Sequence, residues 1–569
     1  NTPMSYQHSF GFRAPRDIQA RAASLDIGQG PSLAILEAET GSGKTEAAYW
    51  HYLRLFRAGQ VDGMYFALPT RTAATQLYRR LVEATRKSFT DSESRPPVVL
   101  AVPGYLSVDD VHGQMLPGFQ VLWSDDKDDR MRLVVDEVHA SDAYMTALLE
   151  SVVDTHFASR GHAFLMSATL GQSVAHRFAK RLSPELPVPT LEAALAAPFP
   201  AVSWQQAGTC TTATANAPGL PKKIALREAS IAGVPHEIAQ LALDAANKGA
   251  SVLVIRNTVK DCRATQAALE ELGGESLFRC KGRLTAHHSR YAKEDRLALD
   301  EAIELAFGLG RSQSGRIAVA TQTIQQSLDL DADFMISDLC PLDVLLQRLG
   351  RLHRHVRSRS QGYERPGCVV LVPDERDLCL SIGTTGEARG EFGLGSVYQD
   401  LRILEATWRL ITERPIWCVP EENRELVERA THPEALAVIT RELGPAMESH
   451  AHWLAAQLAS CRRIADGHLV RRDVAFGHED SCFPHREQSG RITTRLGADD
   501  RLAVFSTPIQ GAFGQPVRQL TIPTYWLRGS VSADEEPVVL EQGPQATRFS
   551  FGGQTFSYDR LGLHKEELR

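Results

Sequence analysis

The sequence predicts an α/β fold with two tandem domains, each built on a parallel sheet, followed by a helical linker and a small C-terminal accessory domain. Three observations support this prediction. Short apolar runs alternate with helical patterns in two successive series, a stretch rich in alanine, threonine and proline separates the series, and the alternation stops after about residue 375. Strands buried on both faces of a parallel sheet have such continuous apolar runs, and the intervening helices cover those faces.

The first series of apolar runs predicts the strands of the N-terminal domain. Runs bounded by turn-forming residues and rich in β-branched and aromatic side chains are typical of strands. They occupy residues 32–36, 64–68, 97–102, 119–123, 132–135 and 163–166. Helical spacing from Glu46 to Phe56 predicts a helix soon after the first strand.

The second series predicts a further domain of the same kind. Its apolar runs occupy residues 251–255, 316–320, 333–337 and 368–372. Between the two series, residues 196–222 have turn formers and few charges, which is typical of a linker. Helical spacing dominates afterwards, and short possible strands end the chain. We therefore expect four regions, at residues 1–205, 206–375, 376–465 and 466–569.

Composition excludes several classes of protein. The 569 residues exceed what a single small binding module needs, and 43% hydrophobic with 23% charged residues is typical of globular chains. The formal charge of −7 requires any nucleic-acid surface to be a local patch. The nine cysteines lack the close pairs of a disulfide framework or zinc site. No apolar run approaches the roughly 20 residues of a membrane helix, so we expect a cytoplasmic protein without a membrane segment.

A phosphate-binding loop follows the first predicted strand. Residues 38–45 read Ala-Glu-Thr-Gly-Ser-Gly-Lys-Thr and lead into the predicted helix. Backbone N–H groups of such a loop surround a polyphosphate, the lysine reaches the β- and γ-phosphates, and the final hydroxyl can bind Mg²⁺. The sequence therefore predicts an ATP and Mg²⁺ site formed by Thr40, Gly41, Ser42, Gly43, Lys44 and Thr45.

Two carboxylates end the predicted strand at 132–135. Asp136 and Glu137 lie about 90 residues after the phosphate loop, and a further strand ends in Ser-Ala-Thr at 167–169. A carboxylate at a strand tip can hold the Mg²⁺ shell, and its neighbour can orient and deprotonate the attacking water. We expect Asp136 in the first role and Glu137 in the second.

Two arginines of the second domain are candidates for stabilising the transferred phosphate. Arg351 and Arg354 lie three residues apart, so they would share one face if this stretch were helical. Guanidinium groups placed across a cleft from the phosphate loop can act as arginine fingers. A solvated basic helix is the alternative explanation for this arginine-rich stretch.

The order of these motifs resembles that of superfamily 2 helicases, in which two RecA-like lobes enclose a nucleotide. The motifs are Ala-x-x-Gly-x-Gly-Lys-Thr, Asp-Glu-x-His, Ser-Ala-Thr and Gln-x-x-Gly-Arg-x-x-Arg, the last beginning at Gln347. The resemblance extends over about residues 10–360 and implies a catalytic role for Gln347. It also implies a base contact by Gln19, DNA contacts by Thr70 and Arg71, a coupling role for Thr321, and a position of Asp329 near the ribose.

Further residues are similar to the CRISPR-associated helicase of type I interference. They are Asp-Glu-Val-His-Ala-Ser-Asp at 136–142, His-Ser-Arg at 288–290 with Asp-Arg at 295–296, the stretch 338–354, Thr494 to Gly497 and Tyr558 to Leu563. This resemblance implies an ATP-dependent helicase that translocates on single-stranded DNA. Its partner would be a guide-RNA surveillance complex of the Cascade type.

The chain departs from most members of that family at its N-terminal side. Most members carry a metal-dependent nuclease with a His-Asp motif before the helicase, and no His-Asp dipeptide occurs in this sequence. Metal-assisted cleavage of DNA needs a cluster of His and Asp ligands. We therefore expect cleavage to require a separate nuclease, or one that was cut away from this chain.

Other interpretations of the sequence remain open at this point. The chain could be another superfamily 2 helicase acting on RNA or duplex DNA, or an ATP-gated scaffold that does not unwind. A zinc module formed by His468, His478, Cys482 and His485 would lack a second thiol pair. Candidate contacts to DNA phosphates near strand ends are Arg71, Arg79, Arg80, Arg256 and Lys260.

Overall fold

The computed structural model describes most of the chain. The described residues are 6–11, 14–28, 30–68, 71–89, 91, 95–102, 105–108, 111–112, 131–138, 143–206, 208–216, 221–312, 314–325, 328–467, 500–527 and 535–566. The chain forms two compact units. The first comprises Asn1–Pro221, Cys418–Val438 and Leu458–Arg471, and the second comprises Lys222–Trp417, Ile439–Gln457 and Arg472–Arg569.

The first unit is built on a six-stranded sheet with the order β2-β6-β7-β1-β8-β9. The strands are β1 (Ser32–Glu37), β2 (Gly63–Ala67), β6 (Met131–Val135), β7 (His162–Ser167), β8 (Ala201–Gln206) and β9 (Thr209–Thr214). Strands β2, β6, β7 and β1 pair in parallel, as their continuous apolar runs predict. Every residue of β1 and β7 is buried, so helices can cover both faces of the sheet.

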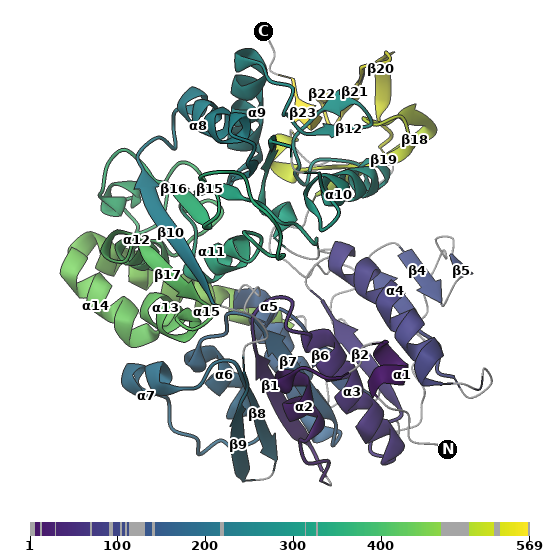
Figure 1. The fold of residues 1–569 in the computed structure, drawn as a ribbon, viewed down its shortest axis with the longest axis vertical. Coiled ribbons are helices and arrows are strands. Elements are labelled where there is room, and N and C mark those ends of the chain that lie inside the picture. Colours follow the sequence, from purple (N-terminus) through teal and green to yellow (C-terminus); the bar gives the residue numbers. More distant parts are fainter. Residues whose placement is uncertain are drawn as a thin grey trace. The chain divides into compact units, whose positions relative to one another are not determined.

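The expected linker at 196–222 is wrong for most of its length. Residues 201–206 form β8, which pairs antiparallel with β1, and residues 209–214 form β9, which pairs antiparallel with β8 (Figure 1). Strand β9 is largely exposed and rich in threonine, so it has no continuous apolar run that would identify it. The boundary between the units therefore falls at residues 221–222 instead of 205–206.

Helices and a small separate sheet complete the first unit. The helices are α1 (Tyr6–Phe10), α2 (Asp17–Ala23), α3 (Lys44–Arg57), α4 (Arg71–Ser88), α5 (Ala143–Ala158), α6 (Gln172–Ala179), α7 (Leu191–Ala196) and α13 (Asn423–Thr431). The apolar run at 97–102 forms β3 (Val99–Val102), which pairs with β4 (Tyr105–Val108) and β5 (Val111–His112) outside the main sheet. The run at 119–123 lies outside the described residues.

The second unit has its own six-stranded sheet with the order β14-β11-β15-β16-β10-β17. The strands are β10 (Lys222–Ala229), β11 (Ser251–Ile255), β14 (Arg316–Ala320), β15 (Phe334–Asp338), β16 (Gly367–Leu371) and β17 (Ile416–Val419). The four expected runs correspond to β11, β14, β15 and β16, which pair in parallel. Strand β10 was not predicted, because exposed residues alternate with its buried apolar residues and leave no continuous apolar run.

Helices of the second unit pack around this sheet (Figure 1). They are α8 (Pro235–Asn247), α9 (Val259–Leu272), α10 (Lys293–Phe307), α11 (Leu342–Leu349) and α12 (Leu401–Glu413). The expected helical linker contains α12, α13, α14 (Pro433–Leu443) and most of α15 (Pro445–Gly467). These helices divide between the two units instead of forming a domain of their own.

The C-terminal strands belong to the second unit. They are β18 (Arg501–Gln510), β19 (Pro516–Ile522), β20 (Val538–Gln542), β21 (Ala546–Phe551), β22 (Gln554–Asp559) and β23 (Gly562–Lys565), paired in two antiparallel sheets. Asp295 of α10 joins them to the α/β core: its buried carboxylate accepts hydrogen bonds from Ala512 N (2.7 Å), Phe513 N (3.0 Å) and the Tyr558 hydroxyl (2.6 Å). The expected accessory domain is therefore an extension of the second unit.

Candidate nucleotide-binding and ATPase site

The phosphate loop has the local geometry that its glycines predict. Gly41 and Gly43 have φ angles of 87° and 93°, which side chains with a Cβ atom rarely adopt. Gly43 also caps the N-terminus of α3, and a Cβ atom there would lie 2.0 Å from Nε2 of Gln19. The close approach and the backbone conformation together exclude larger residues at this position.

The side chain of Lys44 extends back over the phosphate loop that precedes it. Its ammonium donates hydrogen bonds to the carbonyl oxygens of Ala38 (3.0 Å) and Glu39 (3.4 Å), and the side chain is largely buried. The hydroxyl of Ser42 is buried and, within the described part of the chain, has no hydrogen-bond partner. A buried hydroxyl in this position fits a loop whose polar groups are completed by a bound phosphate.

Gln19 reaches the phosphate loop from α2. Its Nε2 donates to the carbonyl oxygen of Gly43 (3.1 Å) and its Oε1 accepts from the backbone N–H of Arg16 (2.8 Å). The guanidinium of Arg16 also donates to the carbonyl oxygen of Gly41. Gln19 therefore lies at the loop, as the sequence predicts, while its contact with a base stays a prediction.

The carboxylates after β6 lie in the same unit as the phosphate loop. The backbone N–H of Asp136 donates to Ala67 of β2 (3.1 Å), and Glu137 adopts a positive φ of 54° with its N–H bonded to Oδ1 of Asp136 (2.9 Å). Burial raises the pKa of Glu137, and the nearby charge of Lys44 counteracts part of that rise. A carboxylate whose pKa lies above its usual value is a stronger base for a bound water.

Strand β7 lies between the strands that carry Glu137 and the phosphate loop. The carbonyl oxygen of Ser167, at the end of β7, accepts a hydrogen bond from Ala38 N (3.1 Å), and the Ser167 hydroxyl accepts one from Thr169 N (3.1 Å). The Ser-Ala-Thr segment therefore adjoins the first residue of the phosphate loop.

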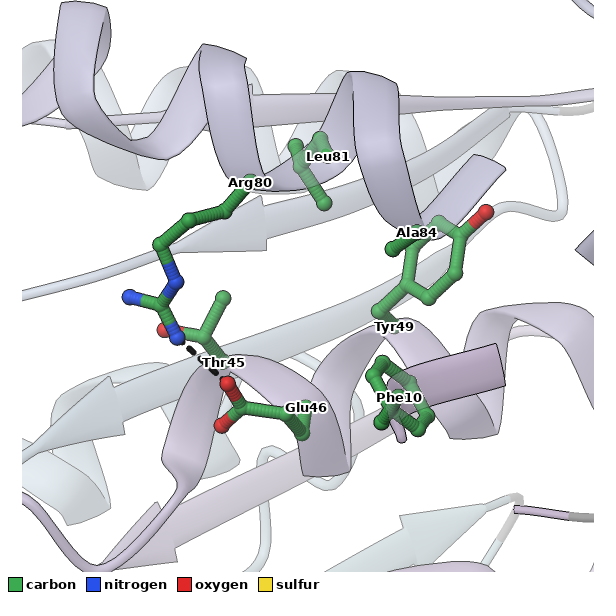
Figure 2. Close-up of a pocket in the computed structure, with 7 residues that line it drawn as sticks. All are labelled: Phe10, Thr45, Glu46, Tyr49, Arg80, Leu81 and Ala84. Atoms are coloured by element: carbon green, nitrogen blue, oxygen red, sulfur yellow. Dashed lines mark hydrogen bonds and ion pairs between the residues drawn. The ribbon is translucent and has the colours of Figure 1, made fainter. Parts of the chain in front are cut away.

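A small pocket opens beside the first turn of α3. It is lined by Phe10, Thr45, Glu46, Tyr49, Arg80, Leu81 and Ala84. Figure 2 shows Arg80 extending from α4 toward Glu46, with which it forms an ion pair. Thr45 lies beside this pair, so the hydroxyl expected to bind Mg²⁺ lines an open space at the loop. Arg80, a candidate for DNA contact, is directed toward this pocket.

The expected finger arginines of the second unit lie beyond α11, which ends at Leu349. Arg351 is buried and its Nη2 donates to the carbonyl oxygen of Gln325 (2.7 Å). Arg354 pairs with Asp329, with Nε 2.7 Å from Oδ1. Because the chain turns at His353 with a φ of 46°, the shared helical face expected for Arg351 and Arg354 is wrong.

Asp329 and Arg354 form a partly buried ion pair in the second unit. Half of the Asp329 side chain is exposed, and its carboxylate also lies 3.1 Å from Nε2 of His355. Burial lowers the pKa of Arg354, and Asp329 and Asp331 oppose that effect. Gln347 is buried near the end of α11. The roles of these residues toward a nucleotide stay predictions.

The structure contradicts a DNA contact by Arg256. Only 1% of this residue is exposed, and its guanidinium donates to Asp338 (2.9 Å), Thr265 (2.6 Å) and the carbonyl oxygen of Ala232 (2.8 Å). A guanidinium enclosed by three partners cannot reach a phosphate. Thr321 is also buried, with its backbone N–H bonded to the carbonyl oxygen of His287 (2.9 Å), so its surface is not available to DNA here.

Several other candidate residues lie outside the described part of the structure. They include Thr70, the side chain of Arg71, and the four residues of the possible zinc module, His468, His478, Cys482 and His485. Within the described ranges, no three His, Cys, Asp or Glu residues gather as metal ligands. In those same ranges, every helix is too short or too polar to span a membrane.

Two family models match the chain. The DEAD/DEAH box helicase model matches residues 16–178, which include the phosphate loop and Glu137. The model of the C-terminal region of the CRISPR-associated nuclease/helicase Cas3 matches residues 248–357, which include Asp329, Arg351 and Arg354.

Curated relatives are similar over larger parts of the chain. The CRISPR-associated endonuclease/helicase Cas3 of Escherichia coli K12 is 29% identical over 448 residues, which cover 70% of this chain and 48% of the relative. The protein of the same description from Thermus thermophilus is 27% identical over 627 residues, which cover 91% of this chain and 64% of the relative. The chain thus spans between about half and two thirds of the length of these relatives.

Solved structures have the same fold. The T. fusca Cas3 structure with ATP has a TM-score of 0.72 at 21% identity, over 99% of this chain and 72% of that one. A CRISPR RNA-guided surveillance complex described as pre-nicking contains a chain with a TM-score of 0.65 at 21% identity, over 97% of this chain and 70% of that one. The expected fold is confirmed: two tandem RecA-like domains followed by a C-terminal region.

Proposed function

We propose that this chain, whose helicase region is of the Cas3 type, is an ATP-dependent translocase that moves along single-stranded DNA and unwinds it in type I CRISPR interference. The observation that carries this proposal is the partly buried Glu137, which lies close enough to Lys44 to feel its charge, in the same unit as a phosphate loop whose Gly41 and Gly43 have positive φ angles. A carboxylate near the phosphate loop can act as the base for the attacking water, whereas a scaffold that only binds nucleotide does not need such a base.

The first unit would bind and orient the nucleotide. The N–H groups of the loop and the Lys44 ammonium would hold the phosphates, replacing the present hydrogen bonds of Lys44 to Ala38 and Glu39. Glu137 would accept the proton of the attacking water. Thr45 and Asp136 offer the hydroxyl and carboxylate oxygens that Mg²⁺ prefers, and a bound Mg²⁺ would neutralise phosphate charge.

The second unit would supply positive charge to the transferred phosphate. Arg351 and Arg354 are the candidates, and Gln347 precedes them in the same motif. Arg354 would have to exchange Asp329 for a phosphate oxygen, which is a feasible exchange because half of the Asp329 side chain is in solvent. Contacts of Thr70 and Arg71 with the DNA backbone are part of the proposal by resemblance alone.

The similarity to known proteins supports a proposal for the partners of this chain. The similarity to a chain in a CRISPR RNA-guided surveillance complex supports a Cascade-type complex as the partner that delivers opened DNA. We propose that cleavage requires a separate His-Asp nuclease. Because this chain spans only part of the length of the curated relatives, these partners are proposals for this chain.

The proposal is tested by comparing nucleic acids as activators of ATP hydrolysis. The purified chain is assayed with ATP and Mg²⁺ alone, and then with single-stranded DNA, blunt duplex DNA or RNA of the same sequence. We expect strong stimulation by single-stranded DNA and little by the other two. Equal stimulation by RNA and DNA contradicts single-stranded DNA as the substrate. An absence of hydrolysis under every condition contradicts the proposed ATPase activity.

A further inference from the structure

Helix α13 belongs to the first unit although the whole core of the second unit precedes it in the sequence. Two charged side chains of this helix, Arg424 and Glu428, are buried. At its C-terminal end, Thr431 packs so closely against Gly171 that a Cβ atom on that glycine would lie 3.2 Å from the Thr431 hydroxyl. Gly171 follows the Ser-Ala-Thr segment after one intervening residue, so α13 lies against the loop that leaves β7.

Arg424 connects two segments of the ATPase site. Its Nη2 donates to Oε1 of Glu37 (2.8 Å), and its Nη1 donates to the carbonyl oxygen of Leu170 (3.0 Å). Glu37 is the last residue of β1 and directly precedes Ala38, the carbonyl partner of Lys44. Leu170 directly follows Thr169. One planar guanidinium therefore joins the start of the phosphate loop to the end of the Ser-Ala-Thr segment.

Further hydrogen bonds close this network. Glu428 accepts from the Nη1 of Arg424 (3.2 Å) and from Gln172 N (2.7 Å), while the Gln172 side chain donates to Oε2 of Glu37 (3.2 Å). Burial raises the pKa of Glu37, and Arg424 opposes that rise. Burying three charged groups costs free energy. Removing one of them costs more than replacing all three by uncharged groups, because the remaining charges are left buried without their partner.

We infer that Arg424 is a positioning residue for ATP hydrolysis. It fixes the separation between the phosphate loop and the Ser-Ala-Thr segment, and with it the place of the end of β7 between the phosphate loop after β1 and Glu137 after β6. This inference rests on the proposed function. Arg424 is 380 residues beyond Lys44, and α13 lies outside both segments that the family models match.

Loss of Arg424 is expected to lower kcat more than it raises KM for ATP. The groups that hold the phosphates, Lys44 and the loop N–H groups, remain on the loop, so ground-state binding survives. Hydrolysis also needs the γ-phosphate aligned with the water held by Glu137, and a misplacement of about 1 Å can cost about 10²-fold in rate. We therefore expect Arg424→Gln to lower kcat at least about tenfold and to change KM less than about threefold.

A matched control lies on the same helix. Arg429 pairs with Glu425 on the solvent side (2.8 Å), so Arg429→Gln removes the same charge from α13 without touching the network. Arg424→Lys keeps the charge and reaches one partner at a time, because an ammonium lacks the planar fork of a guanidinium. It should give a kcat between those of wild type and Arg424→Gln. The triple variant Glu37→Gln/Arg424→Gln/Glu428→Gln removes the three buried charges together and serves if the single variant does not fold.

The test combines steady-state kinetics, thermal unfolding and amide hydrogen exchange on the nucleotide-free protein. We expect faster exchange at residues 38–43 and 168–171 in the Arg424 variants, normal exchange in Arg429→Gln, and the kcat effect described above. A variant with a lowered Tm but normal kcat and normal exchange in both segments overturns the inference, because Arg424 would then only stabilise the fold. If the wild type hydrolyses no ATP, the proposed function fails, while the exchange data still decide whether Arg424 orders the two segments.

Discussion

The surroundings of Glu137 change its affinity for a proton, which matters for its proposed role as a general base. Burial raises the pKa of Glu137 above its value in an unfolded chain, so the folded protein binds this proton more tightly. Its contribution to stability is therefore lost as the pH rises from the unfolded pKa through the folded pKa. Above the folded pKa the ionised side chain opposes folding, which is the opposite of the usual effect of a paired carboxylate.

We expect Glu137→Gln to lose activity and gain stability. Removing a general base costs about 10² to 10⁴-fold in turnover, while nucleotide binding is retained because Lys44 and the loop are unchanged. Without nucleotide and at a pH above the folded pKa of Glu137, the variant should unfold at a higher temperature than wild type, since an uncharged amide replaces a carboxylate that folding partly removes from water. Kinetics and thermal unfolding measured on one preparation check both effects. Near-normal turnover contradicts the role of Glu137 as base.

At Arg256 the surroundings exclude the DNA contact that the sequence predicted. An arginine at a strand end is a reasonable candidate for a phosphate contact, yet its guanidinium is enclosed by Asp338, Thr265 and Ala232. We expect Arg256→Met to destabilise the protein by about 3–5 kcal/mol, because the Asp338 carboxylate is left buried without its cation. Denaturant unfolding measures this loss. The dependence of DNA affinity on salt concentration should stay unchanged in this variant. A weaker dependence on salt would support a contact between Arg256 and a DNA phosphate after all.

At the scale of elements, prediction succeeded where burial is uniform. The strands around the phosphate loop are buried on both faces, so β1, β6 and β7 have continuous apolar runs that a sequence reveals. Strands β8 and β9 are antiparallel additions at one side of the sheet, and the exposed threonines of β9 match a linker in composition. The phosphate loop was predictable because its residues are contiguous, whereas the pair of Arg424 and Glu37 joins positions 387 residues apart.

The attachment of the C-terminal strands to α10 depends on one buried hydroxyl. The Tyr558 hydroxyl donates to Asp295 (2.6 Å) and accepts from Ala292 N (3.0 Å). We expect Tyr558→Phe to destabilise the protein by about 1–3 kcal/mol, because the buried N–H and carboxylate each lose a partner. Tyr525→Phe is the control, since Tyr525 is 75% exposed. Equal unfolding midpoints for the two variants in denaturant contradict this account of the attachment.

At the scale of the whole molecule, the two units are not consecutive pieces of sequence. The chain forms most of the first unit and then most of the second, returns to the first at Cys418–Val438 and again at Leu458–Arg471, and ends in the second. A division into consecutive domains, as the sequence suggested, therefore separates α13 from α7 and from Glu37, with which it is in contact. Contiguous truncation near residue 375 would remove Arg424 and expose Glu37 and Leu170 of the ATPase site.

If ATP hydrolysis drives movement along single-stranded DNA, the rate of hydrolysis should depend on the length of the DNA. Hydrolysis is measured at saturating ATP and DNA with oligonucleotides of increasing length and with circular single-stranded DNA, at one concentration of DNA-binding sites. A translocase hydrolyses more ATP for each binding event on a longer track, so we expect a rate that rises with length and is highest on the circle. A rate that is constant for every DNA longer than the binding footprint would contradict translocation.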